Sequence, residues 1–335
     1  MAGIFCLNSL GDGTFASYLS VMPMNVDPSL LQRLGRLELL ARQAVEGFIT
    51  GLHKSPFHGF SVEFAEHRLY NPGESTRHID WKLYGRTDKL FVKRYEEETN
   101  LRCQLVLDCS SSMWYPAEVD PDSAEMNKLK FALHSSAALM ELFRRQRDAV
   151  GLSVFSEDLE AHIPAKSSPA HMRMIYHELE RLLDTVGSRQ KATSTVEALH
   201  QIAEASPRRS LVIVFSDLLD RGGDIDELMA ALQHLRHNKH EVVLFHVLED
   251  ATEMDFDFAD RPTIFEDLET GEEVRLHPME VRTAYRERMA KLRKELDVRC
   301  AQYRIDWVDV DIASGVFPVL SAYLVKRAKL RSSRF

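Results

Sequence analysis

An acid followed by three hydroxyls stands at residues 108–112, in the order Asp-Cys-Ser-Ser-Ser. The apolar run at residues 103–107 precedes it and is typical of a buried strand. Ligands of open parallel sheets collect outside the carboxyl ends of the strands. Asp108, Ser110 and Ser112 would therefore present several oxygens to one point. Because such hard oxygen ligands suit Mg2+ or Mn2+, the sequence predicts a divalent metal site at the rim of a sheet.

Two further segments can reach the same point. The apolar run at residues 211–215 ends in Ser216-Asp217, and the polar loop Thr193-Ser194-Thr195 leads into a predicted helix. If the two strands are neighbours, three loops supply oxygen ligands to one site. The predicted metal ligands are Asp108, Ser110, Ser112, Thr193 and Asp217. The alternative is structural, because an Asp and serines after a strand can also cap the following helix.

Positioning these residues requires a sheet with helices on both faces. From residue 103 onward, apolar runs alternate with helical periodicity, which predicts an α/β fold with a doubly wound, mostly parallel sheet. Strands are expected at 103–108, 149–155, 211–216, 241–248 and 305–311, with 158–163 as an antiparallel edge. Helices are expected at 125–147, 169–185, 195–205, 223–238, 278–302 and 316–330.

The chain divides into three predicted regions. Residues 1–24 are expected to be a flexible extension, and residues 25–100 an amino-terminal helix (Asp27 to Gly51) with a small β segment (61–70 and 90–97). Residues 101–330 form the sheet domain, into which residues 253–277 insert an acidic stretch and a surface hairpin.

Composition limits the classes of function. The chain has 335 residues, 44% hydrophobic and 28% charged, with a formal net charge of −9, which disfavours a nucleic-acid binder. No apolar run is long enough for a transmembrane helix, and the first 24 residues lack the pattern of a signal peptide. The four cysteines form no C-x-x-C pair, so we expect reduced thiols and a cytoplasmic location.

These motifs resemble a von Willebrand factor A domain with a metal-ion-dependent adhesion site. The resemblance rests on D-x-S-x-S, on the T-x-T-x-x-A-L loop from Thr193 and on the strand that ends in Ser216-Asp217. It implies Mg2+ held directly by Ser110 and Ser112, with Thr193 ligating directly or through water. Asp108 and Asp217 would act mainly through waters and hydrogen bonds, and a sixth position would stay open for a partner's carboxylate.

Two positions depart from the usual pattern of such domains. Lys191-Ala192 precede Thr193 where a Gly-rich lead-in is frequent, and Leu218 follows Asp217 where Gly is frequent. Thr195 is the substitute for Thr193 as a ligand.

The upstream sequence is similar to the bacterial family called "domain of unknown function 58". The similarity lies in Tyr70-x-x-Gly73-x-x-x-Arg77-x-Ile79-Asp80-Trp81 and in Leu90-x-Val92-Lys93-x-Tyr95-Glu96. Genes of that family commonly lie beside a MoxR-type AAA+ ATPase. The resemblance therefore implies a metal-dependent protein-interaction module, an adaptor or co-chaperone for such an ATPase.

Two other functions compete with this one. Asp108 could be the nucleophile of a Mg2+-dependent hydrolase or phosphatase, but a haloacid-dehalogenase-like site has a second Asp where this chain has Ser110. A serine hydrolase would need a G-x-S-x-G elbow, which is absent. We therefore expect no enzymatic activity. The third possibility is a structural scaffold with an empty site.

Overall fold

The computed structural model describes residues 4–6, 36–51, 66–70, 81–94, 101–116, 120, 123, 125–156, 158–184, 195–218, 225–268 and 271–332. The chain forms two compact units. The larger unit comprises Met1–Pro56 and Arg102–Phe335, and the smaller comprises Phe57–Leu101.

A six-stranded sheet with the order β11-β8-β7-β4-β5-β6 forms the centre of the larger unit. Neighbouring strands are parallel except for β6, which pairs antiparallel with β5. The strands are β4 (Arg102–Asp108), β5 (Ala149–Phe155), β6 (Leu159–Lys166), β7 (Leu211–Ser216), β8 (Glu241–Leu248) and β11 (Asp306–Asp311). The predicted doubly wound α/β fold is confirmed, including the antiparallel edge.

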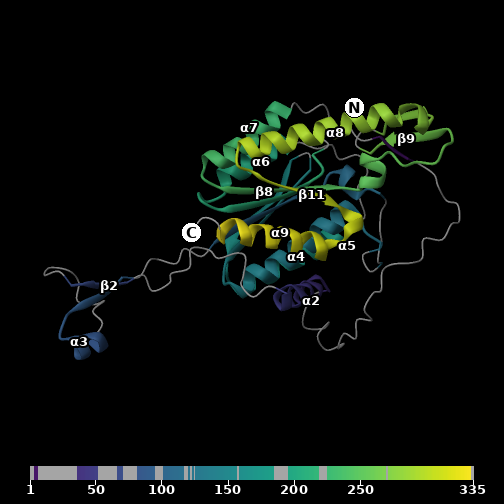
Figure 1. Ribbon diagram of the computed structural model, residues 1–335. Coiled ribbons are helices and arrows are strands. Elements are labelled where there is room, and N and C mark those ends of the chain that lie inside the picture. Colours follow the sequence, from purple (N-terminus) through teal and green to yellow (C-terminus); the bar gives the residue numbers. More distant parts are fainter. Residues whose placement is uncertain are drawn as a thin grey trace. The chain divides into compact units, whose positions relative to one another are not determined.

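Helices cover both faces of this sheet, α6, α7 and α8 on one side and α4, α5 and α9 on the other (Figure 1). They are α4 (Lys128–Arg145), α5 (Pro169–Asp184), α6 (Thr195–Ala205), α7 (Ile225–His237), α8 (Pro278–Gln302) and α9 (Val316–Ser332). The central strands β4 and β7 are buried on both faces, as the continuous apolar runs predict.

The amino-terminal helix α2 (Arg36–Gly51) belongs to the larger unit. Its buried side chains include Leu37, Ala41 and Val45, and it packs against α4 and α5. Arg36 also forms an ion pair with Asp184 of α5 at 2.7 Å. The predicted grouping of this helix with the small β segment in residues 25–100 is therefore wrong, because its apolar face is buried against α4.

The smaller unit holds the predicted small β segment. Strands β2 (Glu66–Leu69) and β3 (Phe91–Arg94) pair antiparallel, and the short helix α3 (Trp81–Thr87) lies between them in sequence. Trp81 is exposed, and its ring packs edge to face with that of Tyr84, with 6.2 Å between the ring centroids. The sequence did not predict α3.

The insertion after β8 begins with the one-turn helix η3 (Asp250–Met254) and continues into the predicted hairpin, β9 (Thr263–Asp267) and β10 (Glu273–Leu276). A third strand, β1 (Ile4–Cys6), pairs antiparallel with β9. The prediction that residues 1–24 form only a flexible extension is therefore wrong for residues 4–6. The rest of that region lies outside the described residues.

Gly151 of β5 occupies a position where a side chain cannot fit. An added Cβ would lie 2.2 Å from Gln104 Oε1 and 2.5 Å from the Ile163 carbonyl oxygen. Because the carbonyl belongs to the backbone of β6, the clash cannot be relieved by a rotamer change. We expect Gly151→Ala to lower the free energy of unfolding by about 1–3 kcal/mol in a denaturant titration.

Gly85→Ala in α3 is the matched control. Its added Cβ meets nothing within 4 Å. This variant should leave the unfolding of the larger unit unchanged, and equal effects of the two substitutions would refute the steric explanation.

Candidate metal centre

The carboxylate of Asp108 is fully buried at the carboxyl end of β4. Its Oδ1 accepts a hydrogen bond from the Ser110 amide at 2.9 Å, and its Oδ2 accepts one from the Ser216 hydroxyl at 2.6 Å. Ser216 ends β7, which pairs in parallel with β4. The condition that these two strands be neighbours is thus met. Since protein donors bond both oxygens, Asp108 is suited to orient other ligands.

Burial and the negative charge of Asp217 raise the pKa of Asp108 to about 7, although the hydrogen bonds that it accepts act in the opposite direction. A cation bound nearby would offset this penalty, because it favours the charged form of a carboxyl group. A positive ion at this edge of the sheet would therefore stabilise the ionised form of Asp108.

Ser110 and Ser112 are both buried, and their hydroxyl oxygens lie 3.0 Å apart. Adjacent ligands of an octahedral Mg2+ lie about 2.9 Å apart when each Mg–O distance is about 2.0–2.1 Å. The two hydroxyls thus have a separation that fits one ion. Ser110 precedes the short helix η2 (Ser111–Trp114), but its side chain makes no capping hydrogen bond to that helix. The next helix, α4, is capped by Asn127 instead. The capping alternative does not explain Ser110.

Thr195 is the first residue of α6, and its side chain is buried. Its hydroxyl has no hydrogen-bond partner in the described part of the chain. A buried hydroxyl without a partner costs about 1–3 kcal/mol, so it is an available ligand. Because α6 leads directly into the parallel strand β7, it starts at the carboxyl edge of the sheet. Thr193 lies outside the described residues.

Asp217 follows β7 and is buried beside Lys128, the first residue of α4. The Lys128 ammonium lies 2.7 Å from Asp217 Oδ2 and 2.6 Å from Glu253 Oε1. Burial alone would lower the pKa of Lys128, but the two carboxylates outweigh it and raise that pKa. Lys128 is therefore a permanent internal cation at this site, and the sequence did not single it out.

Glu253 lies on η3 and is as buried as Asp217. Its second oxygen accepts a hydrogen bond from the Glu249 amide at 2.7 Å. Burial raises the pKa of Glu253 to about 7 against the opposing effect of Lys128. The sequence placed Glu253 in an acidic surface stretch, and this was wrong, because the residue is the internal counter-ion of Lys128.

The loop after β7 explains one departure from the usual pattern. Leu218 has a φ of 54°, a left-handed conformation that glycine adopts without steric cost. Its amide donates to the Ser216 hydroxyl at 3.0 Å, and that hydroxyl donates to Asp108. The backbone geometry thus persists although Leu replaces Gly.

The donor set fits a small, hard cation. The hydroxyls of Ser110 and Ser112 are adjacent, and Asp108 bonds the amide of Ser110. The hydroxyl of Thr195, at the same edge of the sheet, has no partner among the described residues. Within the described residues, no group of three or more His, Cys, Asp or Glu side chains could hold a metal ion. A site here would therefore depend on hydroxyl ligands.

The larger unit is thus a doubly wound α/β unit with hydroxyls and acids at the carboxyl edge of its sheet. The family described as "Protein of unknown function DUF58" matches residues 66–295, and the chain belongs to this family.

The chain is similar to uncharacterized proteins of Mycobacterium bovis (Mb1516) and Mycobacterium tuberculosis (Rv1480). Identity to each is 28% over 228 residues, which cover 67% of this chain and 66% of the relative. The match thus spans just under two thirds of each relative's length.

Among solved structures, an aerotolerance-related membrane protein of Bacteroides fragilis is 17% identical with a TM-score of 0.41, covering 69% of this chain and 99% of its own. BatB of Bacteroides thetaiotaomicron is 17% identical with a TM-score of 0.38, covering 69% and 100%. A von Willebrand factor type A protein of Catenulispora acidiphila is 13% identical with a TM-score of 0.31, covering 45% and 34%.

The predicted cytoplasmic location is contradicted by these neighbours. One is described as a membrane protein, and another, from Vibrio fischeri, as a membrane-spanning protein. Within the described residues, no helix has both the length and the apolar character needed to cross a membrane.

Removing the internal cation should destabilise the fold. Lys128→Met leaves Asp217 and Glu253 buried without compensation, and we expect the free energy of unfolding at neutral pH to fall by about 3–5 kcal/mol. The loss should shrink as the pH falls toward about 5, because burial raises the pKa of Glu253 and this carboxyl group takes up a proton in the folded state. Denaturant titrations at several pH values measure both effects.

Two variants control this prediction. Lys294→Met removes an exposed lysine of α8 and should change stability by less than about 0.5 kcal/mol. Glu253→Gln added to Lys128→Met removes one unpaired charge and should recover part of the loss. A Lys128→Met protein as stable as the wild type would show that the buried ion pair contributes nothing.

Proposed function

We propose that this protein is a metal-dependent protein-interaction module that binds a partner's carboxylate through Mg2+ or Mn2+. The observation that carries the proposal is the pair of buried hydroxyls of Ser110 and Ser112, 3.0 Å apart beside an oriented Asp108. The unpartnered hydroxyl of Thr195 supplies a further ligand. Thr193 and Asp217 complete the ligand set that the resemblance implies.

Charge explains why such a site would attract an acid. Lys128 offsets one of the two negative charges of Asp217 and Glu253, and the other remains near the site together with that of Asp108. Because the direct ligands of a bound Mg2+ would be neutral hydroxyls, its open position would still attract a partner's carboxylate. Ser110, Ser112 and Thr195 hold the ion without adding charge of their own.

The implied partner is a MoxR-type AAA+ ATPase, for which this protein would act as an adaptor or co-chaperone. The support is family membership, since genes of this family commonly lie beside such ATPases. A non-enzymatic role is also supported by the environment of Asp108. Its carboxylate is fully buried and accepts hydrogen bonds on both oxygens, which disfavours it as the nucleophile of a Mg2+-dependent phosphatase.

Mg2+ should stabilise the folded protein, because an ion that binds only the folded state raises the melting temperature. At about a hundredfold excess over Kd the gain is roughly 2.7 kcal/mol, or about 4 °C for a protein of this size. Thr195→Val should lose most of this gain in a thermal melt, yet be as stable as the wild type in chelator, because it removes a hydroxyl that has no partner.

Ser135→Ala is the matched control, since Ser135 on α4 is also buried with an unpartnered hydroxyl. This variant should keep the full response to Mg2+. If Mg2+ raised the melting temperatures of Thr195→Val and Ser135→Ala equally, Thr195 would not be a ligand. If neither Mg2+ nor Mn2+ changed the melting temperature of the wild type, the metal site would be refuted.

Partner binding should depend on the same residues. With the purified MoxR-type ATPase of the same organism, we expect calorimetric binding in Mg2+ that chelator or Ser112→Ala weakens at least about tenfold, a loss of roughly 1.4 kcal/mol. Ser112→Ala is preferred to a change at Asp108, because Asp108 also holds Ser216.

Ser135→Ala again serves as the control and should bind the ATPase as the wild type does. Binding that survives both chelator and Ser112→Ala would place the contact elsewhere on the protein. Metal-dependent hydrolysis of p-nitrophenyl phosphate that Asp108→Asn abolishes would instead establish the phosphatase alternative.

A further inference from the structure

Four turns at the amino edge of the sheet share an unusual backbone conformation. Arg147, Arg209, Lys239 and Arg304 have φ values of 61°, 63°, 64° and 57°. They precede β5, β7, β8 and β11 respectively, and all four side chains are exposed. Left-handed positions at helix ends are usually occupied by Gly or Asn, because a Cβ is disfavoured there. Each of these turns instead carries a cation at a cost in conformational strain.

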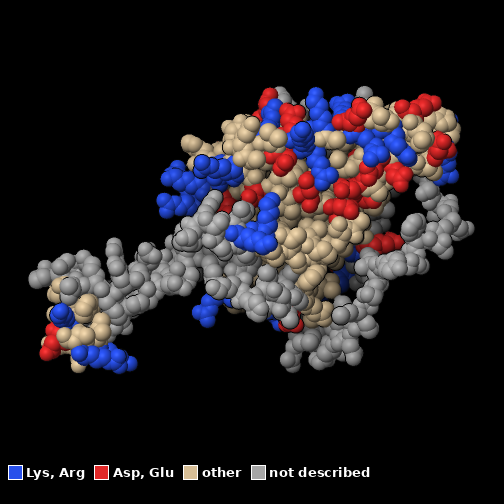
Figure 2. All heavy atoms as spheres, in the orientation of Figure 1, with Lys and Arg blue, Asp and Glu red and all other residues tan. Residues whose placement is uncertain are grey.

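The four cations form a row with Arg102, which is exposed at the start of β4. The strand order places β4 between β7 and β5, so each of the five parallel strands contributes one cation at its amino end. Neighbouring strands lie about 4.8 Å apart, so the row is about 19 Å long. Figure 2 shows Lys and Arg gathered at the left end of the larger unit, where the strands of Figure 1 begin.

None of these five side chains forms an ion pair in the described part of the chain. Glu204 near the end of α6 is exposed, but the other acids near this edge are buried or paired. Asp148 is buried, and Glu241 lies 2.8 Å from the buried guanidinium of Arg327, which is also 3.8 Å from Asp306. In a chain of net charge −9, this edge thus concentrates uncompensated positive charge.

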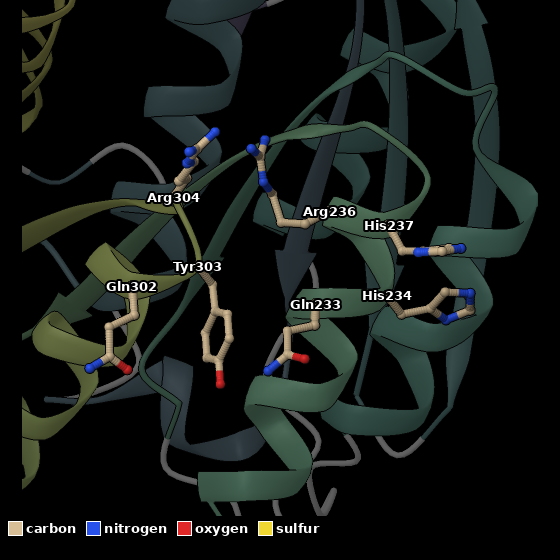
Figure 3. Close-up of a pocket in the computed structure, with 7 residues that line it drawn as sticks. All are labelled: Gln233, His234, Arg236, His237, Gln302, Tyr303 and Arg304. Atoms are coloured by element: carbon tan, nitrogen blue, oxygen red, sulfur yellow. The ribbon is translucent and has the colours of Figure 1, made fainter.

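A pocket of about 610 Å³ lies beside the row, between the carboxyl ends of α7 and α8, and shares Arg304 with it. Arg236 and Arg304 line it, and Figure 3 shows both guanidinium groups on the same side of the pocket. Arg236 donates to the His240 carbonyl oxygen at 2.6 Å, which fixes its position. The other lining residues are Gln233, His234, His237, Gln302 and Tyr303. Two like charges therefore face a space lined by neutral hydrogen-bonding groups and histidines.

We infer that this row and its pocket, here called the cationic edge, bind an extended acidic segment of a partner protein. Arginine predominates, and its planar guanidinium bonds carboxylates through two parallel hydrogen bonds. Surfaces that bind membranes add exposed Trp, Phe or Leu side chains, and grooves for single-stranded nucleic acid interleave several aromatic rings. The four turns offer only the Tyr303 ring.

The test uses a fluorescein-labelled oligoglutamate peptide, read by fluorescence anisotropy at low ionic strength with chelator present. We expect binding that weakens as salt is added. The double variant Arg209→Gly/Lys239→Gly should bind roughly tenfold more weakly, because each exposed ion pair contributes up to about fivefold. Its melting temperature should stay equal or rise, since glycine adopts a positive φ freely. Loss of binding without loss of stability separates the proposal from misfolding.

Lys291→Gln/Lys294→Gln is the matched control, because it removes two exposed positive charges from the middle of α8. It should bind the peptide within about twofold of the wild type. No binding by the wild type, or equal binding by the two double variants, would overturn the inference. So would tighter binding of oligothymidylate, or of vesicles containing equal parts of phosphatidylserine and phosphatidylcholine. Chelator keeps the metal site empty during this assay. A negative result would therefore refute the cationic edge without bearing on the proposed function.

Discussion

The ammonium group of Lys128 lies between two carboxylates that are as buried as it is. Taking one uncompensated charge out of water costs several kcal/mol, so none of the three groups could occupy this place alone. The pairing joins the start of α4, the loop after β7 and the turn of η3. The electrostatics of the carboxyl edge depend on this contact, because the negative charge of Asp217 adds to burial in raising the pKa of Asp108.

The same contact gives the insertion after β8 a connection to the site. Glu253 stands on η3, and η3 leads into the hairpin that β1 extends to three strands. Tyr115, which follows η2, donates its hydroxyl to Thr252 of η3 at 2.5 Å. The loop that carries Ser110 and Ser112 is therefore bonded to the insertion directly as well as through Lys128. Movement of the hairpin would alter the positions of groups on which the hydroxyl ligands depend.

Much of this edge was predictable from the sequence, and the reason is local. Buried parallel strands are continuous apolar runs, and the residues that follow them fall at the rim, so Asp108 and Ser216 could be placed together. Lys128 and Glu253 are far apart in the chain, and their pairing depends on tertiary packing that no periodicity encodes. Pairing of β1 with β9 is non-local in the same way.

The row of cations was missed for a different reason. Arg147, Lys239 and Arg304 each look like an ordinary basic helix end that complements the helix dipole, and Arg209 lies in the loop after α6. Only the strand order places Arg147, Arg209, Lys239 and Arg304 side by side, and only the backbone shows their shared positive φ. A basic residue at one helix end needs no functional explanation. Four of them at left-handed positions, where glycine would avoid the strain, exceed what the dipoles require.

The amino and carboxyl edges of the sheet can act independently because the length of the strands separates them. β4 has seven residues, so about 23 Å separates its ends, well beyond the screening length of about 8 Å at physiological ionic strength. The charge that would reside at the hydroxyl site therefore has little direct effect on the cationic edge. Any coupling between the edges would have to pass through buried strands and largely buried helices such as α4, which favour fixed positions over movement. A partner with acidic groups at both contacts would thus gain affinity by adding two separate contributions, each tunable by substitution at its own edge.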